Sequence, residues 1–244
     1  MTQKLIYKSN TATFLSKKQI GFQTWEYTFS FTDEISWKPG DYTYITLKKR
    51  VSTPDSRGLR RHISIAFMDL SKKKFRIAVR LRDSAFKHEL HGLQKGDTIE
   101  YTAPYGELIL PTQKNVPLAF IIGGIGITAV LSVFEESITK GSKHPITLIY
   151  FNKSQKSTVY KDLLESYKTK LSNFHLIFSM TQEANWKGEN RKVSEDFIVE
   201  YIPNFLKTHF YIVGPERMCQ AVEDELYDLN IADEQIWRED FTGY

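Results

Sequence analysis

The residues best suited to bind a phosphate form a glycine cluster near the middle of the chain, Gly123-Gly124-Ile125-Gly126-Ile127-Thr128. An apolar run precedes it and an amphipathic stretch follows, an order typical of a buried strand, a tight turn and a helix start. Glycine lets the backbone approach a ligand, and the first N–H groups of a helix suit a phosphate. The spacing Gly124-x-Gly126-x-x-Ala129 fits the dinucleotide pattern. It predicts a nucleotide pyrophosphate site, with a ligand-free strand–helix junction as the alternative.

Two stretches earlier in the chain could bind a second anion. Arg61-His62-Ile63-Ser64 offers a guanidinium that can grip a phosphate with paired hydrogen bonds, and a serine that can touch the same ligand. Ser84-Ala85-Phe86-Lys87 opens a predicted helix, for which Asp83 or Ser84 is the expected N-cap. The alternatives are a surface arginine beside an ordinary strand and a plain connecting helix.

Two later stretches are expected at the edge of the sheet that carries the glycine cluster. Val213-Gly214-Pro215-Glu216-Arg217-Met218 again indicates strand, turn and helix, with a proline suited to the first helical turn. The C-terminal Glu239-Asp240-Phe241-Thr242-Gly243-Tyr244 follows the last predicted strand. No spacing typical of a metal site, a Ser-His-Asp triad or a Walker lysine is present, and the chain has one cysteine, Cys219. We therefore expect no metal, and chemistry supplied by a cofactor.

The elements that position these residues change character along the chain. The first part alternates short β-branched and aromatic runs with turns, which predicts an antiparallel six-stranded barrel interrupted by a short helix at 85–91. A polar, proline-bracketed stretch at 111–117 predicts a boundary between domains 1–112 and 113–244. The second part alternates strands and helices, which predicts a doubly wound parallel sheet with ligands at the carboxyl ends of its strands. The expected barrel strands are 11–20, 24–31, 42–47, 62–67, 75–81 and 98–101, and the expected later strands are 118–122, 146–151, 174–178, 209–213 and 235–238.

The composition is that of a globular protein. The chain has 244 residues, 41% of them hydrophobic and 25% charged, with a formal net charge of +4. This charge is too mild and too scattered to indicate nucleic acid binding. The N-terminal residues lack the apolar core of a signal peptide, and no apolar run is long enough to span a membrane. We expect a cytoplasmic protein without membrane insertion; the oligomeric state is not indicated.

The order of these motifs resembles that of the ferredoxin–NADP reductase-like flavoprotein family. Pro39-Gly40-Asp41-Tyr42 is similar to the family's Pro-Gly-Gln-Tyr, and Arg61-His62-Ile63-Ser64 to its Arg-x-Tyr-Ser flavin motif. Ala103-Pro104-Tyr105-Gly106 is similar to its Gly-Pro-x-Gly turn. The resemblance covers nearly the whole chain. It implies an FAD-binding barrel followed by an NAD(P)-binding domain.

The resemblance also implies roles for single residues. Arg61 would bind the flavin phosphate, with His62 and Ile63 beside it, and Ser64 would lie near the flavin N5. Lys87 and the backbone of Ser84, Ala85 and Phe86 would hold the pyrophosphate. Glu239 and Tyr244 would lie near the isoalloxazine and, with Ser64, form the catalytic set. The residues implied to bind the pyridine nucleotide are Gly123, Gly124, Gly126, Thr128, Gly214, Pro215 and Met218.

The chain departs from the family pattern at three places, one of them Lys87, where many members have Ser or Thr. Ile63 replaces the flavin-contacting tyrosine, for which Tyr42, Tyr44 or Tyr105 can substitute, and Val213 replaces a cysteine before Gly-Pro. The second strand of the predicted sheet is not followed by the acid that a classical NAD site uses on the ribose. Three cations could instead meet a 2′-phosphate, which favours NADPH over NADH: Lys153, Lys156 and Arg191.

We therefore expect an FAD-dependent oxidoreductase that passes electrons from NAD(P)H through the flavin to a separate acceptor. The acceptor would be a protein such as ferredoxin or flavodoxin, or a small molecule, because the chain lacks cluster and haem ligands. One alternative is a reductase component of an oxygenase or desaturase system. Another is a flavin-binding regulatory subunit without turnover.

Overall fold

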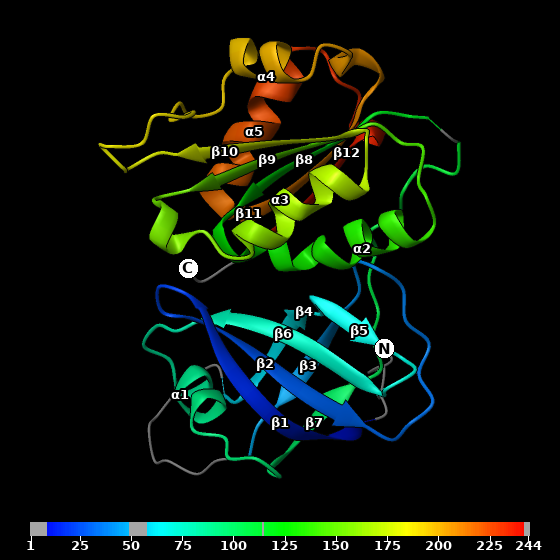
Figure 1. Cartoon of the computed structure of the whole chain (residues 1–244), viewed down its shortest axis with the longest axis vertical. Coiled ribbons are helices and arrows are strands. Elements are labelled where there is room, and N and C mark those ends of the chain that lie inside the picture. Colours follow the sequence, from blue (N-terminus) through cyan, green and yellow to red (C-terminus); the bar gives the residue numbers. More distant parts are fainter. Residues whose placement is uncertain (1–8, 49–57, 114, 242–244) are drawn as a thin grey trace, which may run out of the picture. The chain divides into compact units, whose positions relative to one another are not determined.

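A computed structural model describes residues 9–48, 58–113 and 115–241 of the chain. The contacts between Cα atoms divide the chain into two compact units (Figure 1). One comprises Met1–Leu108 with Thr128–Val133, and the other comprises Ile109–Ile127 with Phe134–Tyr244. Tyr244 and most of the loop before Arg60 lie outside the described residues.

The first unit is built on an antiparallel, barrel-like sheet, as the sequence predicts. Its seven strands follow the order β4-β3-β7-β1-β2-β6-β5. The sheet has one strand more than expected, because the stretch 62–67 divides into two strands. After β4, Ile65 N donates to Asp41 O at 3.0 Å and Ala66 N donates to Arg76 O at 2.9 Å, so the chain leaves its pairing with β3 and joins β6. The strands are β1 Ser9–Gly21, β2 Thr24–Phe31, β3 Tyr42–Thr46, β4 Arg60–Ser64, β5 Phe67–Asp69, β6 Lys74–Arg80 and β7 Thr98–Thr102.

Aromatic side chains fill the interior of this sheet. The alternation along β2 turns Tyr27, Phe29 and Phe31 inward, where each is at most 5% exposed. Phe29 stacks on Phe75 of β6 with 5.3 Å between ring centroids. Helix α1, Ala85–His91, contributes the buried Phe86 to the same core. The side chains on the outer face of the strands are therefore available for ligands.

The second unit is a five-stranded parallel sheet in the order β10-β9-β8-β11-β12, which confirms the predicted doubly wound fold. Its central strands are predominantly apolar, as expected for strands covered on both faces. The strands are β8 Leu118–Gly123, β9 Ile146–Asn152, β10 Phe174–Met180, β11 His209–Pro215 and β12 Ile236–Phe241. The helices are α2 Leu131–Thr139, α3 Lys161–Lys170, α4 Glu195–Tyr201 and α5 Glu216–Asp228.

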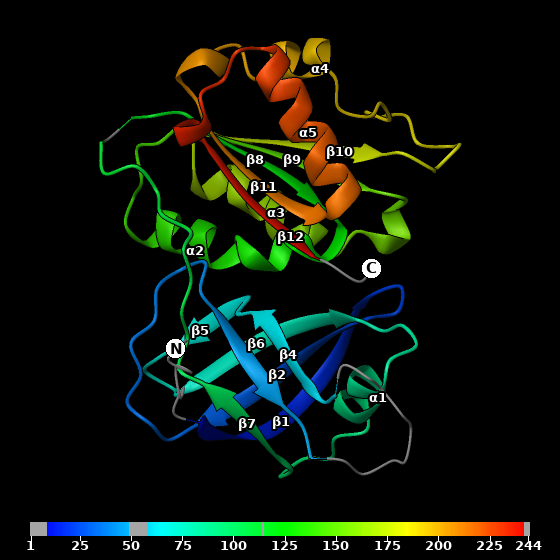
Figure 2. The same ribbon diagram turned by 180° about the vertical axis from the view of Figure 1, so that it is seen from behind.

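The helices of this unit cover opposite faces of the sheet (Figure 2). Phe197 of α4 and Val222 of α5 pack in one buried cluster with Ile149 of β9. On the other face, Phe134 of α2 contacts Phe120 of β8 with 4.9 Å between ring centroids. Tyr167 of α3 lies 6.2 Å from Phe134. Because both faces are covered, the carboxyl edge of the sheet remains for ligands.

The short 3-10 helices mark where the expected boundaries shift. The glycine cluster forms the 3-10 helix η1, Gly124–Ala129, before α2 begins at Leu131. A 3-10 helix, η2 at Gln155–Ser157, likewise precedes α3, which begins at Lys161. In the first unit the N-cap of α1 is Ser84, whose Oγ accepts a hydrogen bond from Lys87 N at 3.4 Å.

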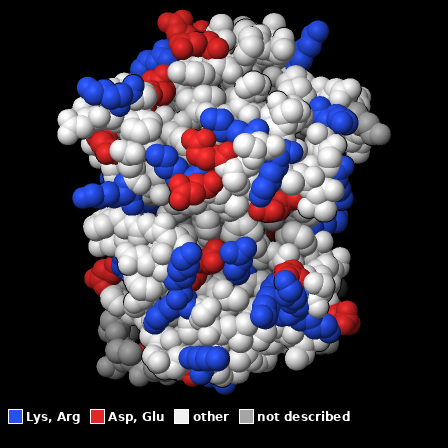
Figure 3. All heavy atoms as spheres, viewed as in Figure 1, with Lys and Arg blue, Asp and Glu red and all other residues white. Residues whose placement is uncertain are grey.

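Charged residues of both signs are interspersed on the face shown in Figure 3. This mixture agrees with the mild net charge of +4. None of the helices in the described part of the chain has the length and apolar character that crossing a bilayer requires.

Candidate cofactor and nucleotide sites

Strand β4 and helix α1 bring two of the predicted anion-binding stretches together. The Arg61 guanidinium lies 5.5 Å above the centre of the Phe86 ring, at the start of α1. Its Nη1 also donates to the carbonyl oxygens of Gly58 and Arg60, at 3.0 and 2.7 Å. These contacts hold the cation beside the first turn of the helix, where backbone N–H groups favour negative charge.

A cavity of about 300 Å³ adjoins the same helix. It is lined by Arg82, Asp83, Lys87 and His88, together with Gln23 of the β1–β2 turn. His88 Nε2 lies 3.2 Å from Asp83 Oδ1. The lining of this cavity is cationic on balance, which suits a phosphate-bearing ligand.

Aromatic rings gather on the outer face of β3 and β4. Tyr42 pairs with Ser64 and Tyr44 pairs with His62 in the register of the two strands. The Tyr42 ring lies 4.5 Å from the Tyr105 ring and 5.8 Å from the His62 imidazole. Burial lowers the pKa of His62, which favours a neutral imidazole in this group. The four residues Tyr42, Tyr44, His62 and Tyr105 are called the aromatic platform below.

The platform shows how the chain accommodates the departure at Ile63. Ile63 packs against the barrel core, in register with the fully buried Thr43. Ser64 is 4% exposed beside Tyr42. The flat outer surface of β3 and β4, over which the Arg60 guanidinium lies 4.3 Å from the centre of the Tyr44 ring, is therefore formed by tyrosine and histidine rings instead of a tyrosine at position 63.

In the second unit, the two glycine turns meet at one edge of the sheet. A Cβ atom at Gly123 would lie 2.5 Å from Met218 Sδ and 2.8 Å from Pro215 Cδ. A Cβ atom at Gly214 would lie 3.1 Å from Gly123 N. Such distances leave no room for a side chain. The stretches 123–128 and 214–218, far apart in the sequence, thus form one close-packed edge at the carboxyl ends of β8 and β11.

Further contacts fix the first turn. Tyr150 OH donates to Gly124 O at 2.8 Å, and Gly124 has a positive φ of 54°. A Cβ atom at Gly126 would lie 2.8 Å from Val213 O. Thr128, within η1, is 4% exposed. The turn is therefore held by β9 on one side and by β11 on the other.

Glu239 of β12 reaches the same edge, because β12 pairs with β11 and places Glu239 opposite Val213. Burial, with a smaller contribution from Asp240, raises the pKa of Glu239 to about 7. Its carboxyl can therefore hold or release a proton near neutral pH. Tyr244, predicted beside it, lies outside the described residues.

Asn152 ends β9 at this edge and is 6% exposed. Its side-chain oxygen and nitrogen have no hydrogen-bond partner within the described residues. Buried amides are normally paired, so the unmet donor and acceptor indicate a site that the fold does not complete. The sequence pattern did not single out Asn152, since asparagine also commonly ends strands.

Two of the three cations considered for a 2′-phosphate lie in the loop after β9, and the third, Arg191, lies between β10 and α4. Lys153 and Lys156 are exposed. Arg191 is engaged elsewhere: its Nη2 lies 2.5 Å from Glu189 Oε2 and its Nη1 lies 2.9 Å from Glu200 Oε2. The geometry therefore does not support Arg191 as a 2′-phosphate ligand, because two carboxylates already satisfy its guanidinium.

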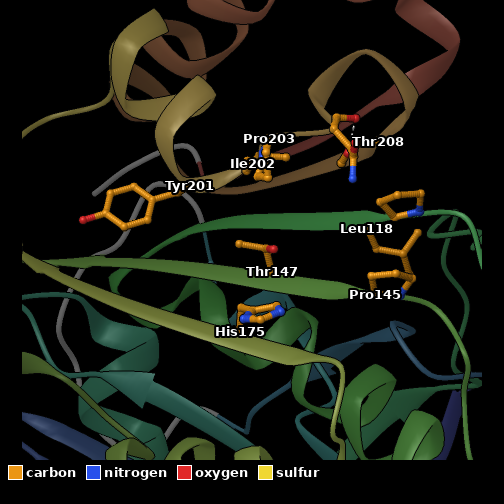
Figure 4. A pocket seen from close by; sticks show the side chains of 10 residues that line it. Leu118, Pro145, Thr147, His175, Tyr201, Ile202, Pro203 and Thr208 are labelled. Atoms are coloured by element: carbon orange, nitrogen blue, oxygen red, sulfur yellow. Dashed lines mark hydrogen bonds between the residues drawn. The ribbon is translucent and has the colours of Figure 1, made fainter.

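Another cavity, of about 280 Å³, lies at the amino ends of the strands. Figure 4 shows Thr147 and His175 on the sheet, facing Ile202 and Pro203 on the opposite wall. Ligands of doubly wound sheets bind at the carboxyl ends of the strands. This cavity is therefore separate from the glycine turns.

Comparisons with known proteins agree with this geometry. Residues 120–224 match the oxidoreductase NAD-binding domain family. Flavohemoprotein from Bacillus subtilis (strain 168) is 28% identical over 204 residues, covering 81% of this chain and 50% of that protein. The chain spans about half the length of the flavohemoproteins it matches.

Two solved structures share the fold. The FAD/NAD-binding domain of nitric oxide dioxygenase from Vibrio cholerae has a TM-score of 0.83 at 18% identity, covering 95% of this chain and 98% of that one. A ferredoxin–NADP⁺ reductase from Neisseria gonorrhoeae with bound FAD and NADP has a TM-score of 0.80 at 19% identity, covering 96% and 98%.

Together these matches show an oxidoreductase NAD-binding domain over residues 120–224, within a chain that has the fold of solved FAD- and NAD(P)-binding reductases. The fold is that of the ferredoxin–NADP reductase-like proteins, which the motif order resembles.

The side chains and backbone described above fit both FAD and a nicotinamide nucleotide. The Arg61 guanidinium beside α1 offers a cation for a phosphate, and the aromatic platform, with the Arg60 guanidinium 4.3 Å from the centre of its Tyr44 ring, offers rings for a flat heterocycle. The backbone at Gly124, which is partly exposed, and the unpaired amide of Asn152 offer close backbone approach and a polar contact for a nucleotide.

Proposed function

We propose that the chain passes electrons from NAD(P)H through FAD to a separate acceptor, such as ferredoxin, flavodoxin or a small molecule. The observation that carries the proposal is the meeting of Gly123 and Gly214 at one sheet edge, in a chain whose other unit holds Arg61 against α1. In this proposal residues 1–112 bind FAD and residues 113–244 bind the nicotinamide nucleotide.

FAD, when bound, supplies the ability to accept a hydride and to release electrons singly or in pairs. Arg61, Lys87 and the backbone of residues 84–86 hold its phosphates. The aromatic platform, of which His62 is a member, and Ser64 orient its ring system. Ile63 contributes packing of β4 against the barrel core.

The nucleotide is bound at the carboxyl edge of the parallel sheet. The backbone of Gly123, Gly124 and Gly126 holds the pyrophosphate, and Thr128 lies within the same turn. Gly214, Pro215 and Met218 close the edge by packing against the first turn. Glu239 holds a proton that its pKa of about 7 allows it to exchange near neutrality. Tyr244 is proposed to control access of the nicotinamide.

A purified preparation tests this function directly. We expect a yellow protein with about one FAD per chain after reconstitution, whose flavin absorbance is lost on anaerobic addition of NADH or NADPH. A colourless protein that takes up no added FAD would overturn the proposal. A yellow protein that neither nucleotide bleaches would instead support a flavin-binding subunit without turnover.

A further inference from the structure

Glu183 lies beside the loop that follows β9, although it belongs to the loop after β10. Beyond the paired strands, Thr181 N donates to Asn152 O at 2.9 Å and Gln182 N donates to Lys153 O at 3.0 Å. This continued pairing carries the next residue, Glu183, to the side of Gln155. Glu183 thus brings a carboxylate from the loop after β10 to the end of β9, the second strand of this unit in the sequence.

The carboxylate of Glu183 is held there by both parts of Gln155. Gln155 N donates to Glu183 Oε2 at 2.5 Å, and Gln155 Nε2 donates to Glu183 Oε1 at 3.1 Å. These two hydrogen bonds, followed by the charges of Lys156 and Lys161, lower the pKa of Glu183. The group is therefore a carboxylate at neutral pH and has a fixed orientation.

The surrounding cations are only partly available to a second anion. Lys161 Nζ lies 5.6 Å from the centre of the Trp186 ring and 3.4 Å from Gln155 Oε1. Lys153 and Lys156 are exposed, and Asp162 adds a negative charge in the first turn of α3. A 2′-phosphate at this loop would meet these lysines together with the carboxylate of Glu183.

We propose that Glu183 is the residue that makes the nucleotide site prefer NADH to NADPH. The inference rests on the proposed function, because it assigns specificity to the same nucleotide site. A carboxylate at the end of the second strand can accept hydrogen bonds from the two hydroxyls of an adenosine ribose. The same carboxylate repels a 2′-phosphate and occupies the Gln155 N–H that such a phosphate would use.

The inference reverses the expectation of NADPH that the sequence favoured. That expectation depended on three cations and on the missing acid after residue 151. In the structure Arg191 is paired with two glutamates and the acid is supplied by Glu183. Because Lys153 and Lys156 remain at this loop, we expect removal of the Glu183 charge to strengthen binding of NADPH.

The test uses the full chain loaded with FAD and measures binding of ADP-ribose and 2′-phospho-ADP-ribose by calorimetry. We expect the wild type to bind ADP-ribose more tightly. Glu183→Gln keeps the side chain's size and an acceptor oxygen for Gln155 N but removes the charge. It should tighten binding of the 2′-phosphorylated probe relative to ADP-ribose by about tenfold or more. Adding Lys156→Ala to this variant should reverse most of the gain.

Glu165→Gln is the matched control, because Glu165 is an exposed glutamate of α3 that pairs with Lys168 at 3.1 Å. It should leave the ratio of the two affinities within about twofold. If Glu183→Gln also leaves the ratio unchanged while both probes bind, Glu183 does not set specificity and the proposed function stands. If neither probe binds wild type or variant, the nucleotide site itself, and with it the proposed function, is wrong.

Discussion

Gly126 and Val213 approach so closely that a Cβ atom on Gly126 would lie 2.8 Å from the Val213 carbonyl oxygen. The contact joins the turn after β8 to strand β11, and both lie at the carboxyl edge of the parallel sheet. Any side chain at position 126 must push the turn away from β11. The glycine is therefore required for packing at the same place where the proposed nucleotide binds.

The Gly126–Val213 contact predicts the effect of Gly126→Ala. The variant should lower the free energy of unfolding by about 1–3 kcal/mol, because the added methyl group overpacks a backbone contact. It should also weaken binding of ADP-ribose. Gly92→Ala is the control, since a Cβ atom there would have ordinary contacts of 3.4 and 3.5 Å and φ is −74°. Urea unfolding measures the stability of both variants. Equal stability of wild type and Gly126→Ala would show that the turn has more room than its contacts indicate.

The position of Arg61 predicts the loss of flavin in Arg61→Ala. Removing the guanidinium should weaken FAD retention by about tenfold or more, because charge-assisted contacts to phosphate are strong. Arg61→Lys should lie between wild type and alanine, as a single ammonium lacks the paired donors. The measurement is FAD content after gel filtration. Lys72→Ala, which removes an exposed partner of Asp69, serves as the control. The same FAD content in Arg61→Ala and wild type would contradict the phosphate role.

Glu239 predicts a pH dependence of stability. Its pKa in the folded chain is raised from 4.5 to about 7, so the folded state binds its proton more tightly than the unfolded state does. The resulting stabilisation is fully present below about pH 4.5 and is lost as the pH rises through about 7. Between pH 5 and pH 8 the free energy of unfolding of the wild type should fall by up to about 3 kcal/mol more than that of Glu239→Gln. Parallel pH profiles of the two proteins in urea unfolding would show that Glu239 titrates normally.

Arg191 is predicted to serve stability instead of nucleotide binding. Arg191→Ala leaves Glu189, whose pKa is lowered to about 2 mainly by Arg191, without its main partner. The variant should unfold at a lower urea concentration than the wild type. Its affinity for 2′-phospho-ADP-ribose should stay within about twofold of the wild type. A large, selective loss of affinity for the phosphorylated probe would restore the role that the sequence suggested.

The unpaired amide of Asn152 predicts a gain in stability for Asn152→Leu. Replacing a buried, unpartnered polar group with an apolar one of similar size should raise the free energy of unfolding by about 1 kcal/mol. The same variant should bind ADP-ribose less tightly, because leucine has no amide group that could form hydrogen bonds with the ligand. Lower stability in Asn152→Leu would mean that the amide is hydrogen-bonded in solution.

Much of the fold follows from local patterns. The alternation of strands and helices predicts the parallel sheet, and the serine at position 84 predicts the N-cap that the structure shows. The chain's departure from β4 into β5 is not visible locally, because Ile65 and Ala66 change partners through backbone bonds to distant residues. Local sequence indicates element type, whereas pairing depends on the whole sheet.

In the candidate sites, too, local sequence indicates some features, whereas others depend on how the strands pair. Glycine spacing identifies the two turns, but their contact through Met218 depends on how β8 and β11 pair. Glu183 is 28 residues from Gln155, with which it forms a hydrogen bond. No spacing rule connects them. The rings of the aromatic platform come from three separate segments, so the substitute for the absent tyrosine at position 63 depends on strand register.

The most direct test of the central claim is rapid anaerobic mixing of the FAD-loaded full chain with NADH, followed by flavin absorbance. We expect one equivalent of NADH to bleach the flavin, and NADPH to do so less efficiently at equal concentration. A flavin spectrum that persists with both nucleotides would contradict the claim that this chain carries electrons from NAD(P)H to FAD.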